Sequence, residues 1–382
     1  MGQYFENVDQ DPLISKDVDD SITFWDHGLD EDDDLFNVTI SEYTRLRRLK
    51  YLFIAACAIF IAGAISVSVT IGSYDIEFLK VYELIIDHIM GTVAPEDEVA
   101  DYVVWELRLP RIIVAIFGGA ALAVAGAVMQ SVLKNPLADS YTTGVASGAG
   151  FGATLAMTFG IVIGSMSSVV ILAFLFALIP IGIIIGISRF TSSSPTTMIM
   201  AGMGTMYIFN ALTTVMMLFA DPHALQTMYA WQVGSLGLAS WDAVPMVMIV
   251  SIVGVAIACM MGGKLNVLAT GDESAKALGI NTDRMRMLLL LLTGVLAAGV
   301  VSFIGLVGFV GLVAPHICRM FIGADNKFLL PASAIFGAVL MLLADQIGQV
   351  LLATPLPVGV VMAFFGGPLF IWLILRRSNK AW

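Results

Sequence analysis

The sequence predicts an all-α, polytopic membrane protein with about ten transmembrane helices. Hydrophobic residues make up 58% of the 382 residues and charged residues only 13%, whereas a soluble domain carries roughly 25% charged residues. Apolar stretches long enough to cross a bilayer, about 20 residues each, recur from residue 50 to residue 375. A soluble enzyme is therefore excluded, because too few charged side chains are present to coat a water-facing surface.

The formal net charge of −11 is concentrated in the N-terminal segment. Residues 1–44 contain 13 Asp and Glu residues and one lysine, Lys16, so the remaining 338 residues carry a net charge of +1. A nearly neutral body has no basic face for nucleic-acid phosphates, and no nucleic-acid partner is expected. Because segment 1–44 also lacks periodic apolar positions, we expect it to be a disordered cytoplasmic tail, followed by a transmembrane domain at 45–382.

Ten apolar stretches are expected to span the membrane in succession. Phe78–Met90, between the first two, is amphipathic and too short to cross, so we expect it to lie at the surface. The eighth stretch is short and contains Pro315. Small residues such as Gly119, Gly126 and Gly148 recur at spacings that let helix backbones approach closely. The predicted spans are 50–72, 110–133, 141–161, 166–188, 196–220, 243–262, 285–305, 308–322, 329–350 and 357–375.

The Lys and Arg residues of the body predict its orientation, because cytoplasmic loops are enriched in positive residues. With the N-terminus inside, fifteen of them fall on the cytoplasmic side and three on the outer side, namely Lys80, Arg108 and Arg111. Both termini are therefore expected in the cytoplasm. The three cysteines form no CxxC and no metal-ligand spacing, so we expect buried structural thiols and no metal site.

Polar residues within the apolar body allow alternative interpretations. Arg108 and Arg111, at the outer mouth of the second span, are close enough in sequence to present one cationic patch. They are either interfacial anchors or a docking point for an acidic external partner. In the ninth span, the intramembrane polar residue Asp345 is expected either to bond across helices or to relay protons.

Two cytoplasmic connections carry further polar signals. The connection between the second and third spans contains Asn135-Pro136, and it is either a tight turn or a narrow point in a pathway. The connection 264–286 contains Thr270-Gly-Asp-Glu273, which fits a capping box, then a short helix at Glu273–Leu278 and a stop at Gly279. We expect this capped helix to offer a surface against which another protein can push.

Several separate blocks of the chain resemble the permease family of type II ABC importers for cobalamin, siderophore-bound iron and haem. The resemblance covers about residues 50–377 and implies that family's fold. It also implies a homodimer, two cytoplasmic ATPase subunits, an external substrate-binding protein and a multi-pass location in the lipid of the cell membrane. The blocks are 108–150 (beginning RLPRIIVAIFGGA), 268–281 (LATGDESAKALGIN), 308–331 (beginning GFVGLVAPHICRM), 342–348 (LLADQIG) and 356–377 (beginning LPVGVVMAFFGG).

The resemblance further implies roles for individual residues. Many family members have Arg as a third outer contact where this chain has Gln349. No cofactor is expected on this chain. A phosphate-binding loop needs Ser or Thr after the lysine of Gly262-Gly263-Lys264, and this chain has Leu265 there. ATP and Mg²⁺ are expected on the ATPase partner. The implied roles are binding-protein docking at Arg108 and Arg111, a cytoplasmic gate at Asn135 and Leu137, a second constriction near Thr196, and ATPase coupling at Gly271, Glu273, Ala277 and Gly279.

The resemblance implies a translocation subunit of an ATP-driven importer for an iron chelate or corrinoid, rather than an enzyme. One alternative is an ion-coupled secondary transporter, which would carry paired ionisable groups near the membrane midplane. In the predicted spans only Asp345 qualifies. Another is a membrane-embedded enzyme, but His88, His223 and His316 share no spacing with Cys or acidic residues that indicates a catalytic group.

Overall fold

The computed structural model describes residues 48–72, 74–161, 168–190, 194–352 and 354–376. The chain divides into two compact units, 1–52 and 53–382, and the second contains every described helix apart from the beginning of Arg48–Thr70. The predicted tail at 1–44 lies outside the described residues. The described secondary structure is helical and contains no strand, which confirms the predicted all-α class.

The apolar helices of the described residues agree with the predicted number of about ten spans. Seven are long and apolar enough to cross a membrane, and three apolar segments are shorter. The long helices are Arg48–Thr70, α4 (Leu109–Val132, with the helical turns before it), α6 (Ser168–Phe190), α7 (Pro195–Leu218), α9 (Ala243–Met260), α12 (Thr282–Ile304) and α14 (Asn326–Val350). The shorter segments are α5 (Val145–Phe159), α13 (Val310–Ile322) and the first part of α15 (Val358–Arg376).

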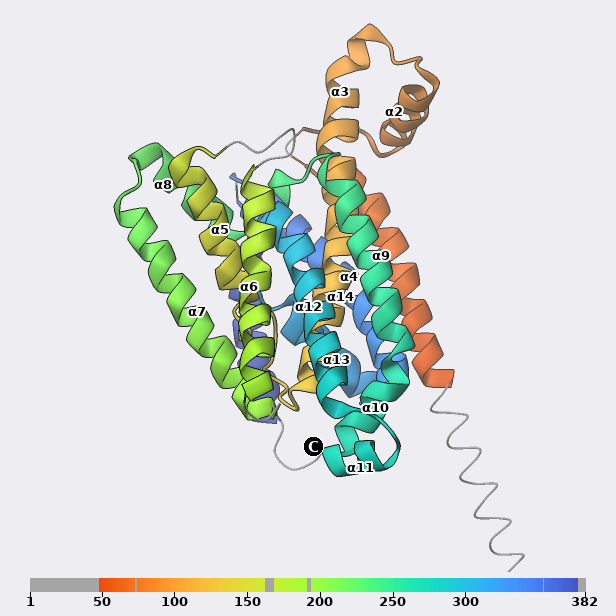
Figure 1. Ribbon diagram of the computed structural model, residues 1–382. Coiled ribbons are helices and arrows are strands. Elements are labelled where there is room, and N and C mark those ends of the chain that lie inside the picture. Colours follow the sequence, from red (N-terminus) through yellow and green to blue (C-terminus); the bar gives the residue numbers. More distant parts are fainter. Residues whose placement is uncertain (1–47, 73, 162–167, 191–193, 353, 377–382) are drawn as a thin grey trace, which may run out of the picture. The chain divides into compact units, whose positions relative to one another are not determined.

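Helix α4 is the central element, and it contacts α9, α12, α13 and α14 (Figure 1). Every residue from Ala121 to Gln130 is buried. A Cβ atom added at Gly126 would lie 2.0 Å from the Gly311 carbonyl oxygen of α13, and one at Gly119 would lie 2.4 Å from the Gly337 carbonyl oxygen of α14. The small residues therefore bring helix backbones into direct contact, as the sequence predicts.

Helix α5 packs against α6 and α7. A Cβ atom at Gly152 would lie 2.3 Å from the carbonyl oxygen of Leu172 in α6, so these backbones also touch. The helix has only 15 residues, because it begins after Gly144 and ends at Gly160, which both have left-handed backbone conformations. The predicted span 141–161 is thus a short helix approached by irregular chain.

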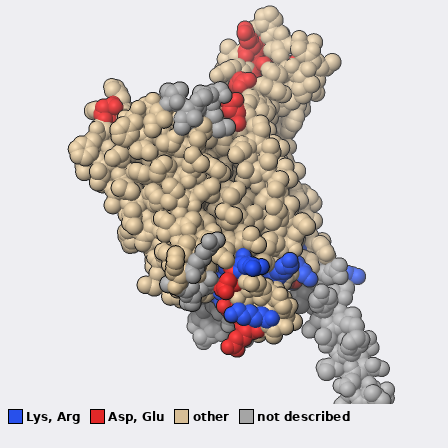
Figure 2. Space-filling model, in the orientation of Figure 1, with Lys and Arg blue, Asp and Glu red and all other residues tan. Residues whose placement is uncertain are grey.

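Short helices occupy the two ends of the bundle. The predicted surface helix is present as α2 (Phe78–Met90), and its His88 bonds to Asp101 of α3 (Glu98–Tyr102) at 2.8 Å. On the face that Figure 2 shows, Asp and Glu lie over α3, and Lys and Arg gather together with further Asp and Glu over α10 (Gly262–Thr270) and α11 (Asp272–Ala277), with an uncharged band between. The other short elements are η1 (Pro95–Asp97), η2 (Val103–Arg108), α8 (Pro222–Val233) and η3 (Leu236–Leu238).

Candidate functional site

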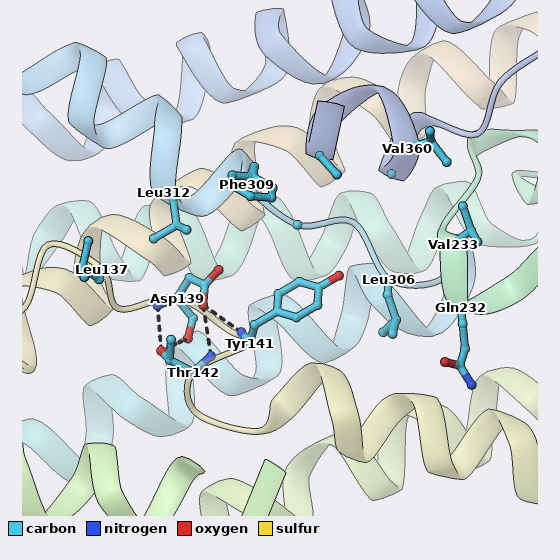
Figure 3. A pocket seen from close by; sticks show the side chains of 13 residues that line it. Leu137, Asp139, Tyr141, Thr142, Gln232, Val233, Leu306, Phe309, Leu312 and Val360 are labelled. Carbon is cyan, nitrogen blue, oxygen red and sulfur yellow. Dashed lines mark hydrogen bonds between the residues drawn. The ribbon is translucent and has the colours of Figure 1, made fainter. Parts of the chain in front are cut away.

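A cavity of about 500 Å³ opens between four segments of the chain (Figure 3). These segments are the connection between α4 and α5, the end of α8, the residues around the beginning of α13, and the beginning of α15. Leu137, a predicted gate residue, lies in the wall, which is mainly apolar. The lining residues are Leu137, Asp139, Tyr141, Thr142, Gln232, Val233, Leu306, Gly308, Phe309, Leu312, Gly359, Val360 and Ala363.

Backbone hydrogen bonds hold three of these segments together. The N–H of Ser235, just after α8, donates to the carbonyl of Ile304 at 2.8 Å, and the N–H of Gly359 donates to the carbonyl of Gly234 at 3.1 Å. Position 359 requires glycine, because an added Cβ would lie 1.9 Å from the carbonyl oxygen of Val233. The ends of α8 and α12 and the start of α15 therefore meet in one rigid part of the cavity wall.

Asp139 is a buried carboxylate in the connection before α5 (Figure 3). One of its oxygens accepts hydrogen bonds from the backbone N–H groups of Tyr141 and Thr142, both at 3.0 Å. Burial nevertheless raises the pKa of Asp139 to about 6, because lost hydration disfavours the charged form more than these donors favour it. The cavity wall thus contains a carboxyl group that titrates close to neutral pH.

Replacing Asp139 with asparagine is expected to remove a pH dependence of stability. The pKa of an Asp carboxyl is ordinarily 3.8 and that of Asp139 in the folded chain is about 6. The stability that the neutral carboxyl provides is therefore present below about pH 4 and lost as the pH rises through 6. Asparagine keeps an oxygen for both backbone donors and carries no charge, so Asp139→Asn should be more stable at about pH 7.5, by on the order of 3 kcal/mol.

Thermal unfolding of the detergent-purified protein at two pH values measures this effect. At about pH 4 the unfolding temperatures of Asp139→Asn and the parent should nearly coincide, since the parent carboxyl is then protonated in the folded state. A difference that stays constant between about pH 4 and pH 7.5 would contradict the raised pKa.

The three residues predicted for the gate lie in different places. Leu137 is 46% exposed in the cavity wall. The side-chain oxygen of Asn135 accepts a hydrogen bond from the backbone N–H of Leu137 at 3.0 Å, so Asn135 shapes the turn that presents Leu137. Thr196 is exposed in the first turn of α7. Neither Asn135 nor Thr196 is among the described residues that line the cavity.

The short capped helix predicted at Glu273–Leu278 is present as α11, which begins and ends one residue earlier than predicted. It stops as predicted before Gly279, whose φ of 80° is in the left-handed region. The capping-box prediction is wrong, because the Thr270 hydroxyl donates to the carbonyl of Val267 at 2.8 Å and the N-cap residue is Gly271. Helix α10, which directly precedes α11, is not predicted by the sequence.

The four predicted ATPase-coupling residues lie together in and around α11. Glu273, Ala277 and Gly279 are exposed, and Gly271 is partly exposed. Ala275, between them, is buried and fastens the helix to the body. The predicted residues are therefore accessible at this end of the bundle.

The sequence interpretation misses an ionic cluster at the first residue of α11. Asp272 accepts two hydrogen bonds from Arg286 of α12, at 2.8 and 2.5 Å, and lies 3.6 Å from the Lys134 ammonium group. Arg286 holds the pKa of the Asp272 carboxyl below its usual value, with a smaller contribution from Lys134. The sequence feature that indicates such a cluster is Arg286, because a cation inside a predicted span needs a partner.

Arg108 is a buried helix-capping residue in this structure. Its guanidinium donates to the backbone carbonyls of Val69 at 2.6 Å, Thr70 at 2.9 Å and Tyr74. These carbonyls lie at and just beyond the end of Arg48–Thr70, where the last carbonyls of a helix lack intrahelical partners. Arg108 and Arg111 therefore do not form the exposed cationic patch that their spacing in the sequence indicates.

Arg111 joins α4 to α14 through Asp345. Its Nε and Nη2 atoms donate to the two carboxylate oxygens, each at 2.8 Å, and Gln349 donates to the same carboxylate at 2.9 Å. The side chains of Arg111 and Asp345 are 19% and 2% exposed. Asp345 thus bonds across helices, one of its two predicted roles, and Gln349 is part of the same cluster.

About ten apolar helices packed in one bundle, with short helices at its two ends, define a multi-pass membrane protein. The chain belongs to the FecCD transport family, whose profile matches residues 51–376. It is 36% identical over 288 residues to the hemin transport system permease protein of Yersinia pestis, and the matched region covers 72% of this chain and 84% of that relative. It is also 36% identical over 295 residues to the cobalamin import system permease protein of Halobacterium salinarum, covering 74% and 76% respectively.

A solved structure supports the same family assignment. A transporter assigned to the metal-chelate type of ABC transporter, in an inward-facing conformation, matches with a TM-score of 0.75 and 29% identity over 85% of this chain and 98% of that chain. The predicted family is confirmed. The chain is a multi-pass protein of the cell membrane and a permease subunit rather than an enzyme, since ATP hydrolysis in such transporters belongs to a separate subunit.

Proposed function

We propose that the chain is the transmembrane subunit of an ATP-driven importer for an iron chelate (a siderophore complex or haem) or a corrinoid. The cargo passes from an external binding protein across the cytoplasmic membrane. The observation that carries this proposal is the continuous family match over residues 51–376, which includes both the cavity and α11. The relatives named for hemin and cobalamin transport, and the metal-chelate type of the similar structure, support this class of cargo.

In the proposed assembly, two copies of the chain stand side by side in membrane lipid. Two ATPase subunits, which bind ATP and Mg²⁺, contact α11, and the external binding protein docks at the opposite end, near Arg108 and Arg111. Both chain termini lie in the cytoplasm. The gathering of Lys and Arg over α10 and α11 (Figure 2) supports this orientation, because positive residues mark the cytoplasmic side.

The proposed pathway runs between the two copies. Large apolar side chains of α7, including Met200, Met203 and Tyr207, are exposed on the single chain and are suited to line it. An apolar wall offers a metal complex few specific bonds, so affinity resides in the binding protein. ATP binding moves the ATPases and with them α11, and the opening at Leu137 changes between two access states.

An ion-coupled secondary transporter is the rival function. It needs an ionisable group that exchanges with the coupling ion near the midplane. Asp345, the predicted candidate, is engaged by both Arg111 and Gln349, which favours a structural role and the ATP-driven mechanism.

Uptake by cells that lack this chain tests the proposal. Loss of the chain should abolish high-affinity accumulation of radiolabelled ferric siderophore, haem or cobalamin, and the parent chain should restore it. The cargo that is lost identifies the substrate. Unchanged uptake of all three compounds would contradict the proposed substrate class.

A further inference from the structure

The α10–α11 segment lies at one end of the bundle (Figure 1). It contacts the body through two polar clusters with different properties. Asn266 of α10 donates to the carboxylate of Asp325 at 2.6 Å and accepts from the backbone N–H of Asn326 at 2.8 Å. Asn326 in turn accepts from the hydroxyl of Ser131 in α4 at 3.0 Å. Because Asn326 is buried and Leu265 beside Asn266 is also buried, α10 is fixed to the ends of α14 and α4.

The second cluster centres on Asp272, on the other side of a glycine joint. Gly271 separates α10 from α11 with φ 135° and ψ 159°, a conformation that favours glycine. Asp272 follows as the first residue of α11. A rotation about Gly271 would therefore displace Asp272, together with the end of α12 to which it is bonded, relative to α10.

Asp272 has one strong and one exchangeable ionic contact. The bond to Arg286 uses both carboxylate oxygens, and the Arg286 side chain is 1% exposed, so α11 and α12 are held together. The contact to Lys134 spans 3.6 Å, and both side chains are more than a third exposed. A pair this exposed forms and breaks readily, as a contact that differs between two access states must.

Lys134 belongs to a compact turn that ends at the cavity. The backbone N–H of Asn135 donates to the carbonyl of Gln130, that of Ala138 donates to Asn135, and the Asn135 side chain accepts from Leu137. Lys134 itself has a left-handed backbone with φ 49°. A displacement of Lys134 therefore carries Leu137, three residues later in the cavity wall, with it.

We propose that Asp272 is the positioning residue that transmits movement of α11 to the gate, through its ionic contact with Lys134. This inference rests on the proposed function, since it requires ATPases that act on α11. The contact forms in one access state and breaks in the other, so that Leu137 changes its exposure when ATP binds. Neither Asp272 nor Lys134 contacts the cargo in this mechanism.

The test follows the exposure of position 137 in the full complex with its ATPase subunits. In a Leu137→Cys background, the rate of alkylation by a water-soluble maleimide is measured without nucleotide and with ATP plus vanadate, and the parent with its native cysteines provides the blank. Lys134→Met removes the charge without disturbing the Arg286 bond. We expect ATP hydrolysis to persist and the nucleotide-dependent change in alkylation to shrink at least about fivefold.

Two matched variants sharpen the result. Lys134→Arg keeps the charge and should keep the nucleotide-dependent change. Asp283→Asn removes an exposed acid from the first turn of α12 and should also keep it, whereas Asp272→Asn should lose it as Lys134→Met does. A full nucleotide-dependent change in Lys134→Met would overturn the inference alone. A background complex that hydrolyses ATP without any change at position 137 would overturn the proposed gate and the inference together.

Discussion

Replacing Asp345 with alanine is expected to unfold the bundle at a much lower temperature than the parent. The substitution leaves the Arg111 guanidinium without its carboxylate partner between α4 and α14, where only 19% of the Arg111 side chain is exposed. Breaking a buried ion pair by removing one partner costs about 3–5 kcal/mol. Thermal unfolding in detergent can be followed through the reaction of a thiol-sensitive dye with Cys318, which is buried in the folded chain.

Two controls separate the ion pair from the loss of a polar side chain. Gln349→Ala removes one hydrogen bond to the same carboxylate and should cost only about 1 kcal/mol. The double variant Arg111→Leu, Asp345→Leu removes both charges and should recover most of the lost stability. If Asp345→Ala unfolded within a degree or two of Gln349→Ala, the pair would not be the bond that holds α4 to α14.

Replacing Gly126 with alanine is expected to disrupt the packing of α4 against α13. The new Cβ would lie 2.0 Å from the carbonyl oxygen of Gly311, and since that atom belongs to helix backbone, one whole helix must shift. Overpacking of a tight core costs about 3 kcal/mol. The yield of monodisperse protein and its unfolding temperature measure the effect.

Gly182→Ala is the matched control for this substitution. Gly182 also lies inside a transmembrane helix, α6, but an added Cβ there meets no atom within 4 Å. Alanine should therefore be neutral or stabilising by about 0.5–1 kcal/mol at that position. Equal behaviour of the two alanine variants would show that α4 and α13 are less closely packed than the structure describes.

The transmembrane architecture is largely predictable from the sequence, because each long span appears as a continuous stretch of apolar residues. Phe78–Met90 is found at its predicted bounds, and the glycines of α4 lie where close packing requires them. Helix α10 escapes prediction, since nine residues of mixed character between a span and a glycine carry no periodic signal. Thr270 has the spacing of a capping residue, but its hydroxyl bonds to Val267 instead, a choice that spacing cannot reveal.

Pairings between distant residues are the part that the sequence does not predict. Arg111 and Asp345 are 234 residues apart, and each allows a plausible separate role until the fold brings α4 beside α14. In the sequence, Arg108 resembles a surface cation. Its partners in the fold are backbone carbonyls, and no sequence pattern marks such partners. The Asp272–Lys134 contact depends in the same way on how α11 lies against the turn after α4.

We expect this chain to move its cargo with energy from ATP that partner subunits hydrolyse. Proteoliposomes containing the chain with its ATPase subunits, supplied with the binding protein, provide the most direct measurement. Uptake of labelled ferric siderophore, haem or cobalamin should require ATP and should persist when proton and sodium gradients are collapsed. Uptake by the chain alone, driven by an ion gradient without ATPase subunits, would contradict an ATP-driven mechanism.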